Sequence, residues 1–405
     1  MRILIVGLRW PPETFIVRLL RSLLHAGYDI TVATKKQPDA SWQQPNFHWL
    51  PLSGWGSSKF VRFLHLGWLA LSVMRHIPRG IKRFKQQIPG TISWKRRLRY
   101  WYELLPFVGQ HWDVIYFPWN ATAIRYLPLF DQADNVLISC RGSHVNIKPY
   151  DPRMGRFREK LRETFGRATA IHCVSQAILD EASQWGLSPN KSWIIRPAVD
   201  PEFFKPSLTS SSETENGVFH IVTIGSLIWL KGYEYALQAI YTLRKAGLAV
   251  QFDIIGDGVG RERIIYTIQD LELEDCVHLH NAIPPIQVRD ILQKSHAFVL
   301  ASLSEGISNA VLEAMACSLP IVTTNCGGMT EVITDGCEGF IVPMYDAHQI
   351  ANRLWQLAQD PELRKRMGHF GRQRILQEFT LTHQTNQFVA LFRSLKLPHD
   401  DDKNA

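Results

Sequence analysis

The chain alternates, almost from end to end, between short runs rich in β-branched and aromatic residues and longer segments with helical periodicity. This alternation is typical of βαβ units, in which helices cover both faces of a parallel sheet. Helical patterns such as Thr14–Ala26 and Arg153–Gly166 separate the expected strands. Those strands are Arg2–Val6, Asp29–Ala33, Asp113–Phe117, Val136–Ser139, Ala170–Val174, Ser192–Ile195, His220–Ile224, Gln251–Ile255, Val277–His280, Ala297–Leu300, Ile321–Thr324 and Phe340–Val342. The sequence therefore predicts an α/β fold.

The middle of the chain separates two such series of strands. Residues 201–217 read PEFFKPSLTSSSETENG, a composition that favours an interdomain linker. A chain of 405 residues is also longer than one ordinary core. We therefore expect two Rossmann-like domains, at 1–200 and 218–379, with a last helix at about 380–397 that packs back on the first. Doubly wound sheets bind ligands outside the carboxyl ends of their strands, so two facing domains would hold a ligand in the cleft between them.

Composition excludes several classes of protein. Hydrophobic residues make up 45% of the chain and charged residues 20%, unlike a disordered or fibrous protein. The six cysteines show no Cys-x-x-Cys spacing and lie mostly in apolar runs. They indicate the reduced thiols of a cytoplasmic protein rather than a disulfide framework or a zinc site. The opening MRILIVGLRWPPE is too short in its apolar stretch for a signal peptide, and no uncharged apolar run reaches the roughly 18 residues of a membrane span.

Positive charge is concentrated between Lys59 and Tyr102, which we call the basic segment. It contains eleven Lys or Arg and no Asp or Glu, more than the whole net charge of +8. Aromatic residues are interspersed with these cations. The mixture suits an anionic membrane interface, and single-stranded nucleic acid binds similar mixtures. It would also fit a solvated helix pair whose aromatic side chains face the core. Because of the motifs below, we expect a membrane surface and no nucleic acid.

Two glycine turns in the second half follow expected strands. The stretch Gly225–Gly232 (GSLIWLKG) follows His220–Ile224, and Gly256–Asp257–Gly258 follows Gln251–Ile255. Glycine lets the backbone approach a ligand, and Lys231 can place an ammonium group beside phosphate oxygens. Since strand–glycine–helix turns occur throughout α/β proteins, each is a weak signal alone. Together they indicate a ligand at one sheet edge.

A third motif, ASLSEGISNAVLEAMA at 301–316, gives the stronger signal. Ser308 or Asn309 would cap a helix there, and the free amides of its first turn form an anion site. Glu305 precedes this helix and Glu313 lies inside it, eight positions on. At about 100° per residue, that separation leaves the two about 80° apart around the helix axis. Two glutamates alone are usually a surface pair. Beside the loop, the cap and the two glycine turns, they predict a site for a diphosphate flanked by a ribose and a pyranose.

These motifs resemble those of the family-4 retaining glycosyltransferases of the GT-B fold. The stretch Glu305–Glu313, followed by EAMA, is similar to that family's Glu, seven residues, Glu motif, and GSLIWLKG to its G-[RS]-L-x-x-x-K-G loop. IIGDG, LPIV and NCGGMTEVITDGCEGFIV also match, as do PPETFI, IHCVS and RPAVDPEFF in the first half. The likeness spans nearly the whole chain, and it is greatest to the bacterial exopolysaccharide and colanic-acid type of transferase. It implies two facing Rossmann-like domains with a donor cleft between them.

Carried over residue by residue, the resemblance implies that Lys231 contacts the diphosphate of a nucleotide-sugar donor. Glu313 would bind the ribose hydroxyls and Glu305 the hydroxyls of the donor sugar. The other implied donor-binding residues are Gly225, Ser226, Gly256, Gly258, Gly306, Ile307, Ser308, Asn309 and Ala310. Fixed donors aimed at the charge of the departing diphosphate lower the barrier, so no metal or other cofactor is expected. The Asp-x-Asp pattern at Asp400–Asp402 is interpreted as a solvated tail.

The sequence departs from the family pattern at two positions of the second half. Ser226 stands where the family has a phosphate-binding Arg, although some members carry Ser there. Ser318 stands where the LPIV motif usually begins with Gly.

In the first half, the family's His-Gly-x-Asp element appears as Arg141–Gly142–Ser143–His144. Either Arg141 or His144 is expected to take the catalytic or donor-positioning role of the family's histidine. Arg9, Glu13 and Thr14 follow the first strand, where the family's acceptor site lies, and are candidates to touch the acceptor.

The sequence thus predicts a hexosyltransferase that uses a nucleotide sugar and a glycan or a polyprenyl- or lipid-linked acceptor in cell-surface polysaccharide synthesis. It would work in the cytoplasm at the inner face of the cell membrane. GDP-mannose, UDP-glucose, UDP-galactose and UDP-N-acetylglucosamine all fit as donors. The alternative is a catalytically silent sugar-nucleotide-binding or scaffold protein, which would bind donor without turnover. A third reading is a GT-B sugar-nucleotide epimerase, which would release nucleotide without an acceptor.

Overall fold

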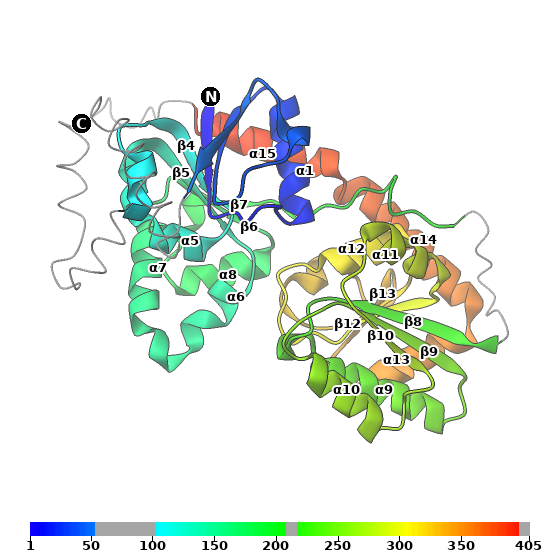
Figure 1. The fold of residues 1–405 in the computed structure, drawn as a ribbon. Helices are drawn as coiled ribbons and strands as arrows, with labels where there is room; N and C mark the ends of the chain where they lie inside the picture. Colours follow the sequence, from blue (N-terminus) through cyan, green and yellow to red (C-terminus); the bar gives the residue numbers. More distant parts are fainter. Residues whose placement is uncertain (53–101, 208–216, 397–405) are drawn as a thin grey trace. The chain divides into compact units, whose positions relative to one another are not determined.

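The computed structural model describes residues 1–52, 102–207 and 217–396, which divide into two compact α/β units (Figure 1). Unit 1 comprises the described residues of Met1–Cys173 and Leu179–Ile194 and those from Thr385 onward. Unit 2 comprises Val174–Ile178 and the described residues of Ile195–Gln384. The prediction of an α/β protein with two parallel sheets is confirmed. Most of the basic segment, and Asp400–Asp402, lie outside the described residues.

Unit 1 is built on seven parallel strands in the order β3-β2-β1-β4-β5-β6-β7. The central strands β1 and β4 are buried except for Arg2 and Asp113 because helices cover both faces, and their buried residues are accordingly apolar. The strands are β1 (Arg2–Val6), β2 (Asp29–Thr34), β3 (Phe47–Pro51), β4 (Trp112–Phe117), β5 (Ala133–Cys140), β6 (Ala170–Cys173) and β7 (Ser192–Ile194).

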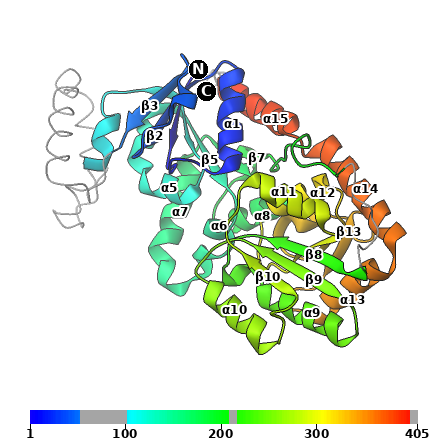
Figure 2. The same cartoon turned by 45° about the vertical axis from the view of Figure 1, so that its right-hand side comes forward.

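Helices α1 and α15 lie on one side of this sheet, and α5 and α7 on the other (Figure 2). Phe388 and Phe392 of α15 pack on Tyr116 of β4, and Phe388 also lies 4.9 Å from the ring of His172. The last helix of the chain therefore completes the core of unit 1. The helices are α1 (Thr14–His25), α5 (Asn120–Arg125), α6 (Ser143–Asn146), α7 (Gly155–Arg167), α8 (Gln176–Gln184) and α15 (Leu381–Ser394), with short 3-10 turns η1 (Ala40–Trp42), η2 (Leu105–Phe107), η3 (Leu127–Gln132), η4 (Lys148–Tyr150), η5 (Pro152–Met154) and η6 (Pro189–Lys191).

Unit 2 is built on six parallel strands in the order β10-β9-β8-β11-β12-β13. Both sheets follow the Rossmann order, in which successive strands are added outward first on one side and then on the other. In unit 2 that direction reverses between β8 and β11. The strands are β8 (Phe219–Ile224), β9 (Val250–Ile255), β10 (Val277–His280), β11 (Ala297–Leu300), β12 (Ile321–Thr324) and β13 (Gly339–Val342).

Each face of the unit 2 sheet carries its own hydrophobic core. Helices α9, α10 and α13 cover one face, and α11 and α12 the other (Figure 1), while α14 contributes Leu363 and Met367 to the first core and Ile375 to the second. Leu237 of α9 and Leu354 of α13 are fully buried in the first core, and Leu292 of α11 and Leu312 of α12 in the second. The helices are α9 (Tyr233–Lys245), α10 (Arg261–Asp270), α11 (Pro285–Lys294), α12 (Asn309–Ala316), α13 (Ala347–Gln359) and α14 (Pro361–Glu378), with 3-10 turns η8 (Trp229–Lys231) and η9 (Gly327–Glu331).

The start of the expected linker at 201–217 belongs to unit 2. Phe204 is buried in the second core, and Arg372 donates hydrogen bonds to the carbonyl oxygens of Pro201 and Phe204 at 2.9 and 2.8 Å. Just before it, Val199 forms a bridge with Thr380. The composition suggested a linker because Pro, Ser and Thr dominate it, but the two phenylalanines of PEFF are apolar enough to enter the core.

Candidate donor site

The loops that follow β8 and β11 meet at the point where the strand order of unit 2 reverses. Ligands of doubly wound sheets bind at this point because the loops diverge there and leave room above the strand ends. The N–H of Leu303, in the loop after β11, donates to the carbonyl oxygen of Leu230, in the loop after β8, at 2.7 Å. The predicted GSLIWLKG and ASLSEG stretches are therefore joined directly.

An ion pair lies at this junction. The Nζ of Lys231 lies 2.5 Å from Oε1 of Glu305, and the two side chains are only 19% and 12% exposed. The hydroxyl of Ser302 donates to the same carboxylate oxygen at 2.7 Å. Behind Lys231, Gly232 takes a left-handed conformation, and a Cβ there would overlap the carbonyl oxygen of Ala301. The Lys231 turn can thus pack on the Glu305 loop only with glycine at this position.

Tyr233, the first residue of α9, supports the loop after β8. Its hydroxyl donates to the carbonyl oxygen of Gly225 at 2.9 Å. Burial raises the pKa of Tyr233, and the negative charge of Glu305 raises it further. The hydroxyl therefore stays a neutral hydrogen-bond donor across the physiological pH range.

The glycine turn after β9 packs on the loop after β8. Leu227 donates to the carbonyl oxygen of Asp257 at 2.9 Å, and Gly260 donates to that of Leu227 at 2.8 Å. A Cβ at Gly256 would overlap the carbonyl oxygen of Gly225, and one at Gly258 would crowd the backbone of Leu227. The two predicted donor-binding glycines are therefore explained by close packing within the chain itself. Contact with a donor stays a prediction for both.

Helix α12 begins beside the ion pair. Ser308 occupies the N-cap position, but its side chain makes no capping hydrogen bond to the first turn. Gly306, Ile307 and Ser308 are buried, whereas Asn309 is exposed. The amides of this first turn have no partner within the helix, which is the usual origin of an anion site at a helix start.

The two glutamates of the motif lie where they were expected, Glu305 before the helix and Glu313 inside it. Glu305 lies in the loop, before α12 begins at Asn309, so the rotation of about 80° around one axis does not apply to the pair. Glu313 is half-buried within α12. The pKa of the Cys317 thiol is raised to about 12, mainly by burial. The positive charge of Arg372 opposes this rise, and the negative charge of Glu313 adds to it. The charge of Glu313 is thus felt by Cys317 at the end of α12, whereas the charge of Glu305 is paired with Lys231.

A second layer of contacts supports the Glu305 loop and was not assigned from the sequence. The N–H of Gly328 donates to the carbonyl oxygen of Gly306 at 2.8 Å, and the hydroxyl of Thr324 donates to that of Ser302 at 2.5 Å. Gly327 is left-handed, and a Cβ there would overlap the carbonyl oxygen of Glu305. These residues lie in or beside the NCGG stretch. Its two adjacent glycines are the sequence feature that could have indicated close packing on the Glu305 loop.

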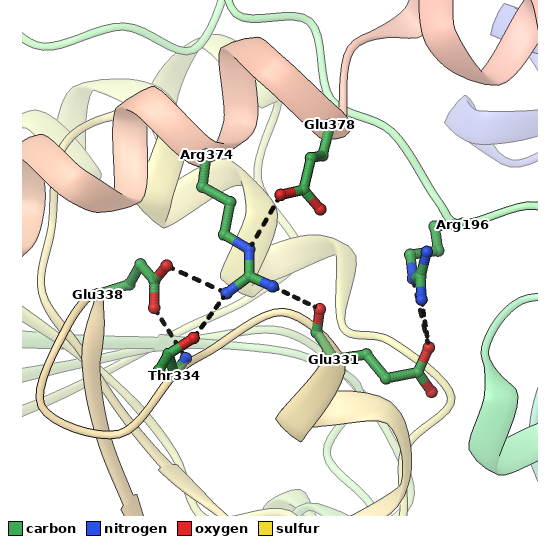
Figure 3. A network of polar contacts seen from close by, with 6 residues as sticks. All are labelled: Arg196, Glu331, Thr334, Glu338, Arg374 and Glu378. Carbon is green, nitrogen blue, oxygen red and sulfur yellow. Dashed lines mark hydrogen bonds and ion pairs between the residues drawn. The ribbon is translucent and has the colours of Figure 1, made fainter.

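The 3-10 turn that carries these glycines ends in a network of polar contacts (Figure 3). Glu331 accepts a hydrogen bond from the N–H of Ala177 at 3.1 Å and from the guanidinium of Arg196 at 3.0 Å. The guanidinium of Arg374 donates to the carbonyl oxygen of Glu331 and to the carboxylate of Glu338, both at 3.0 Å. Within unit 2, the chain segments around 177 and 196 are thus tied to the turn beneath Glu305.

In unit 1, Arg141 lies at the carboxyl end of β5 among aromatic rings. Its guanidinium carbon is 4.3 Å from the ring centroid of Phe15 and 5.8 Å from that of Trp119. Desolvation raises the pKa of Glu13, and the charge of Arg141 lowers it in part. Arg141 and Glu13, two of the residues predicted from the sequence, are therefore close enough to interact. Arg9 is exposed in the loop after β1.

His144 lies on α6, three residues after Arg141. Its carbonyl oxygen accepts a hydrogen bond from Asn120 at 3.3 Å. Burial lowers the pKa of its imidazole, and the charge of Lys148 lowers it further. The ring is therefore neutral at pH 7. Helix α1 begins at Thr14, whose side chain lies outside what the structure describes, and Ser226 is exposed in the loop after β8.

The described residues contain neither a metal cluster nor a membrane-spanning helix. In that part of the chain, no group of three or more His, Cys, Asp or Glu side chains is placed to hold a metal ion. None of the helices described there is long and apolar enough to cross a membrane.

Comparison with known proteins identifies the chain. The model for the glycosyltransferase family 4 matches residues 12–203, and that for the glycosyl transferases group 1 matches residues 206–374. The protein named as the colanic acid biosynthesis glycosyltransferase WcaL of Salmonella typhimurium is 22% identical over 410 residues, which cover 95% of this chain and 97% of that protein.

Solved structures agree in fold. Sucrose-phosphate synthase from Thermosynechococcus elongatus superposes with a TM-score of 0.75 at 16% identity, covering 98% of this chain and 99% of that one. HepE of Anabaena, solved in complex with UDP and glucose, gives a TM-score of 0.72 at 15% identity and covers 97% and 100%. Two Rossmann-like units with these likenesses define a glycosyltransferase of the GT-B fold. Within that class, the chain belongs to the family 4 and group 1 glycosyltransferases.

Proposed function

We propose that this glycosyltransferase moves a hexose from a nucleotide-diphosphate sugar to a glycan or lipid-linked acceptor, with retention of configuration and without a metal ion. The observation that carries the proposal is the Lys231–Glu305 pair, held at the strand-order reversal of unit 2 beside the start of α12. A cation, a carboxylate and a row of helix amides are the groups that a sugar diphosphate requires.

The chemistry follows from charge development. When the bond between the sugar and the diphosphate breaks, negative charge grows on the departing phosphate. The ammonium of Lys231 and the first-turn amides of α12 are fixed before the reaction, so they stabilise that charge without reorganising. The diphosphate would draw Lys231 toward itself, which frees Oε1 of Glu305 to accept hydrogen bonds from sugar hydroxyls. Ser302 keeps the carboxylate in place during this exchange, because its hydroxyl donates to the same oxygen.

Glu313 is proposed to bind the ribose hydroxyls of the donor. Arg141 and His144 of unit 1 are the candidates for positioning the donor sugar. They offer different chemistry, since Arg141 is a permanent cation and His144 is a neutral imidazole that can accept or donate one hydrogen bond. Arg9 and Glu13 are proposed to contact the acceptor.

The comparisons support an exopolysaccharide role. The name of the WcaL relative refers to colanic acid biosynthesis, and the HepE structure contains UDP and glucose. UDP-glucose is therefore the first donor to test, followed by UDP-galactose, UDP-N-acetylglucosamine and GDP-mannose. We further propose that the protein works at the inner face of the cell membrane, which the basic segment would contact.

The proposal is tested by incubating the full chain with each nucleotide sugar and measuring the release of the nucleoside diphosphate. Slow hydrolysis or transfer of one donor is expected, and the anomeric configuration of the product, read by NMR, should equal that of the donor. Binding without any turnover would favour the catalytically silent scaffold. Release of nucleotide together with an epimerised sugar would favour an epimerase.

Metal independence gives a separate prediction. Because Lys231 and the α12 amides supply the positive charge, turnover should be unchanged, within about twofold, after treatment with excess EDTA. The same assay without EDTA is the control. Complete loss on chelation, restored by manganese or magnesium, would show that the diphosphate is held in another way.

A further inference from the structure

The 3-10 turn η9 packs directly against the loop that carries Glu305. The N–H of Gly328 donates to the carbonyl oxygen of Gly306 at 2.8 Å, and a Cβ at Gly327 would overlap the carbonyl oxygen of Glu305. Met329, in the middle of the turn, is fully buried in the second core. The contacts with the loop join backbone to backbone, so no side-chain rotation can absorb a displacement of the turn. The Glu305 loop therefore follows any movement of η9.

A second set of contacts joins the turn to the start of helix α8, whose residues up to Ile178 belong to unit 2. A Cβ at Gly328 would lie 2.7 Å from the Cβ of Ser175, which is completely buried. The hydroxyl of Ser175 accepts the N–H of Ile178 at 3.1 Å and thus caps α8. Glu331, the last residue of η9, accepts the N–H of Ala177 at 3.1 Å. The partial positive charge of a helix N-terminus favours a carboxylate there.

Glu331 is held through both its side chain and its backbone (Figure 3). Its side chain is 15% exposed and accepts hydrogen bonds from Nε and Nη2 of Arg196 at 3.3 and 3.0 Å. Its carbonyl oxygen accepts a hydrogen bond from Arg374, which also pairs with Glu338. Arg196 is itself fixed, since Gln384 donates to its carbonyl oxygen at 2.9 Å. Contacts from three other chain segments thus hold the end of η9.

Both oxygens of the Glu331 carboxylate are engaged. Oε1 accepts the N–H of Ala177, and Oε2 accepts the two N–H groups of Arg196. Contacts on both oxygens restrain the rotation of the carboxylate. Partly buried ion pairs add little stability, because desolvation offsets most of their attraction. The arrangement is therefore better explained by the geometry that it imposes on η9 than by stability alone.

We propose that Glu331 is a positioning residue for the donor site. It acts through η9 on the backbone of Glu305, and so sets the place of the carboxylate that accepts the sugar hydroxyls. This role rests on the proposed function of Glu305. A misplacement of about 1 Å at a reacting group can lower the rate by about 10²-fold, so a small shift of η9 is measurable in kcat.

A double-mutant cycle tests whether Glu331 acts through Glu305. With a confirmed donor, Glu331→Ala should lower kcat by about tenfold or more, because it releases the N–H of Ala177 and the guanidinium of Arg196 together. In a Glu305→Ala background the same change should lower kcat by less than about twofold, because the positioned group is already absent. An equal loss in both backgrounds would overturn the proposal, since Glu331 would then act on the fold in general.

Two arginine variants separate positioning from the loss of an ion pair as such. Arg196→Gln should lower kcat by about threefold or more, and Arg196→Lys, which keeps a cation beside Glu331, should restore part of it. The matched control is Arg244→Gln, which should keep wild-type kcat. The side chain of Arg244 pairs with Asp275 and is 35% exposed, against 41% for Arg196. Equal kcat in Arg196→Gln and Arg244→Gln would contradict the proposal.

Hydrogen–deuterium exchange gives a readout that needs no donor. The peptide of residues 302–308 should exchange faster in Glu331→Ala and in Arg196→Gln than in wild type, and at the wild-type rate in Arg244→Gln. Unchanged exchange in the first two variants would overturn the positioning through η9. Faster exchange together with wild-type kcat in Glu305→Ala would instead contradict the proposed function. Urea unfolding shows whether each variant is folded, and Glu331→Gln replaces Glu331→Ala if the latter is not.

Discussion

Burying the charges of Lys231 and Glu305 carries a desolvation cost. Partly buried ion pairs contribute little to stability, because removing both charges from water offsets most of their attraction. Here both side chains are over four-fifths buried, and Ser302 adds a further hydrogen bond to the carboxylate. Charged groups that pay this desolvation cost at the carboxyl edge of the sheet are better explained by pre-organisation for an anionic ligand than by a contribution to stability.

His144 gives a residue-scale prediction about pH. Burial and the charge of Lys148 lower its pKa below the ordinary 6.5. Just below pH 6.5 the imidazole therefore binds a proton in the unfolded chain but not in the folded chain. The stability that neutral His144 contributes is therefore complete above pH 6.5 and is lost as the pH falls below it. His144→Gln should reduce the drop in urea-unfolding free energy between pH 7 and pH 5. His348→Gln, at an exposed position on α13, is the control. An identical drop in His144→Gln and wild type would contradict the pKa assignment.

Several site residues could be predicted and others could not, for a physical reason. Lys231 and Glu305 stand in recognisable motifs after expected strands, and the sheet order then brings them together. Ser302 and Tyr233 were missed, because their roles depend on where one hydroxyl points, which no local pattern encodes. The choice between Arg141 and His144 stays open for the same reason, since both lie at the carboxyl end of β5.

At the scale of elements, α12 ends in a Schellman motif. The N–H of Ser318 donates to the carbonyl oxygen of Met315, and that of Leu319 to the carbonyl oxygen of Ala314. The residue between such bonds takes a left-handed conformation, and Ser318 has φ 63°. Helix α9 ends in the same way with Gly247, which suits this conformation better. The departure from the family's usual glycine thus introduces local strain.

Ser318→Gly should therefore stabilise the protein. Relief of the left-handed conformation is worth about 1–2 kcal/mol, and the extra entropy of glycine in the unfolded chain costs about 0.5–1 kcal/mol. A net gain of about 0.5–1 kcal/mol is expected in the free energy of unfolding by urea. Ser318→Ala keeps the strained conformation and should show no gain. A Ser318→Gly variant no more stable than Ser318→Ala would contradict this explanation.

Element boundaries show where sequence patterns stop being informative. The strands β1, β10, β11 and β12 have the predicted ends. In β1, β11 and β12 an apolar run coincides with burial, whereas in β10 only Val277 is buried. Strand β3 was not expected. It lies at the edge of its sheet with one of its five residues buried, so it shows neither an apolar run nor a clear alternation. The position of Glu305 before α12 was expected, because Ser308 or Asn309 was predicted to cap that helix, and α12 begins at Asn309 with Ser308 as its N-cap.

At the scale of the molecule, the basic segment sets the net charge, although most of it lies outside the described residues. The proposed lipid-linked acceptor would keep its reactive sugar near the membrane surface, so the proposal requires the enzyme to dock there. Each Lys or Arg near an anionic surface contributes roughly 1 kcal/mol, and aromatic side chains add interfacial burial. The cations expected to form most of this surface are Lys82, Arg83, Lys85, Lys95, Arg96, Arg97 and Arg99.

Changing Lys95, Arg96, Arg97 and Arg99 together to Gln should weaken sedimentation with anionic liposomes by about tenfold or more. Raising the salt concentration should weaken the wild type in a similar way, because screening removes the same attraction. Donor affinity should hardly change, since the proposed donor residues Lys231 and Glu305 belong to unit 2. Unchanged liposome binding of the quadruple variant at low salt would show that the segment is an ordinary solvated face.

The central claim is that the Lys231–Glu305 junction handles the donor, and turnover of these two variants tests it most directly. With any confirmed donor, Lys231→Ala and Glu305→Ala should each lower kcat by about two orders of magnitude or more, because each removes a charged group at the reacting centre. Lys245→Ala and Glu362→Ala, at exposed positions on α9 and α14, are the matched controls and should keep wild-type turnover. Wild-type kcat in either Lys231→Ala or Glu305→Ala would place the reaction elsewhere.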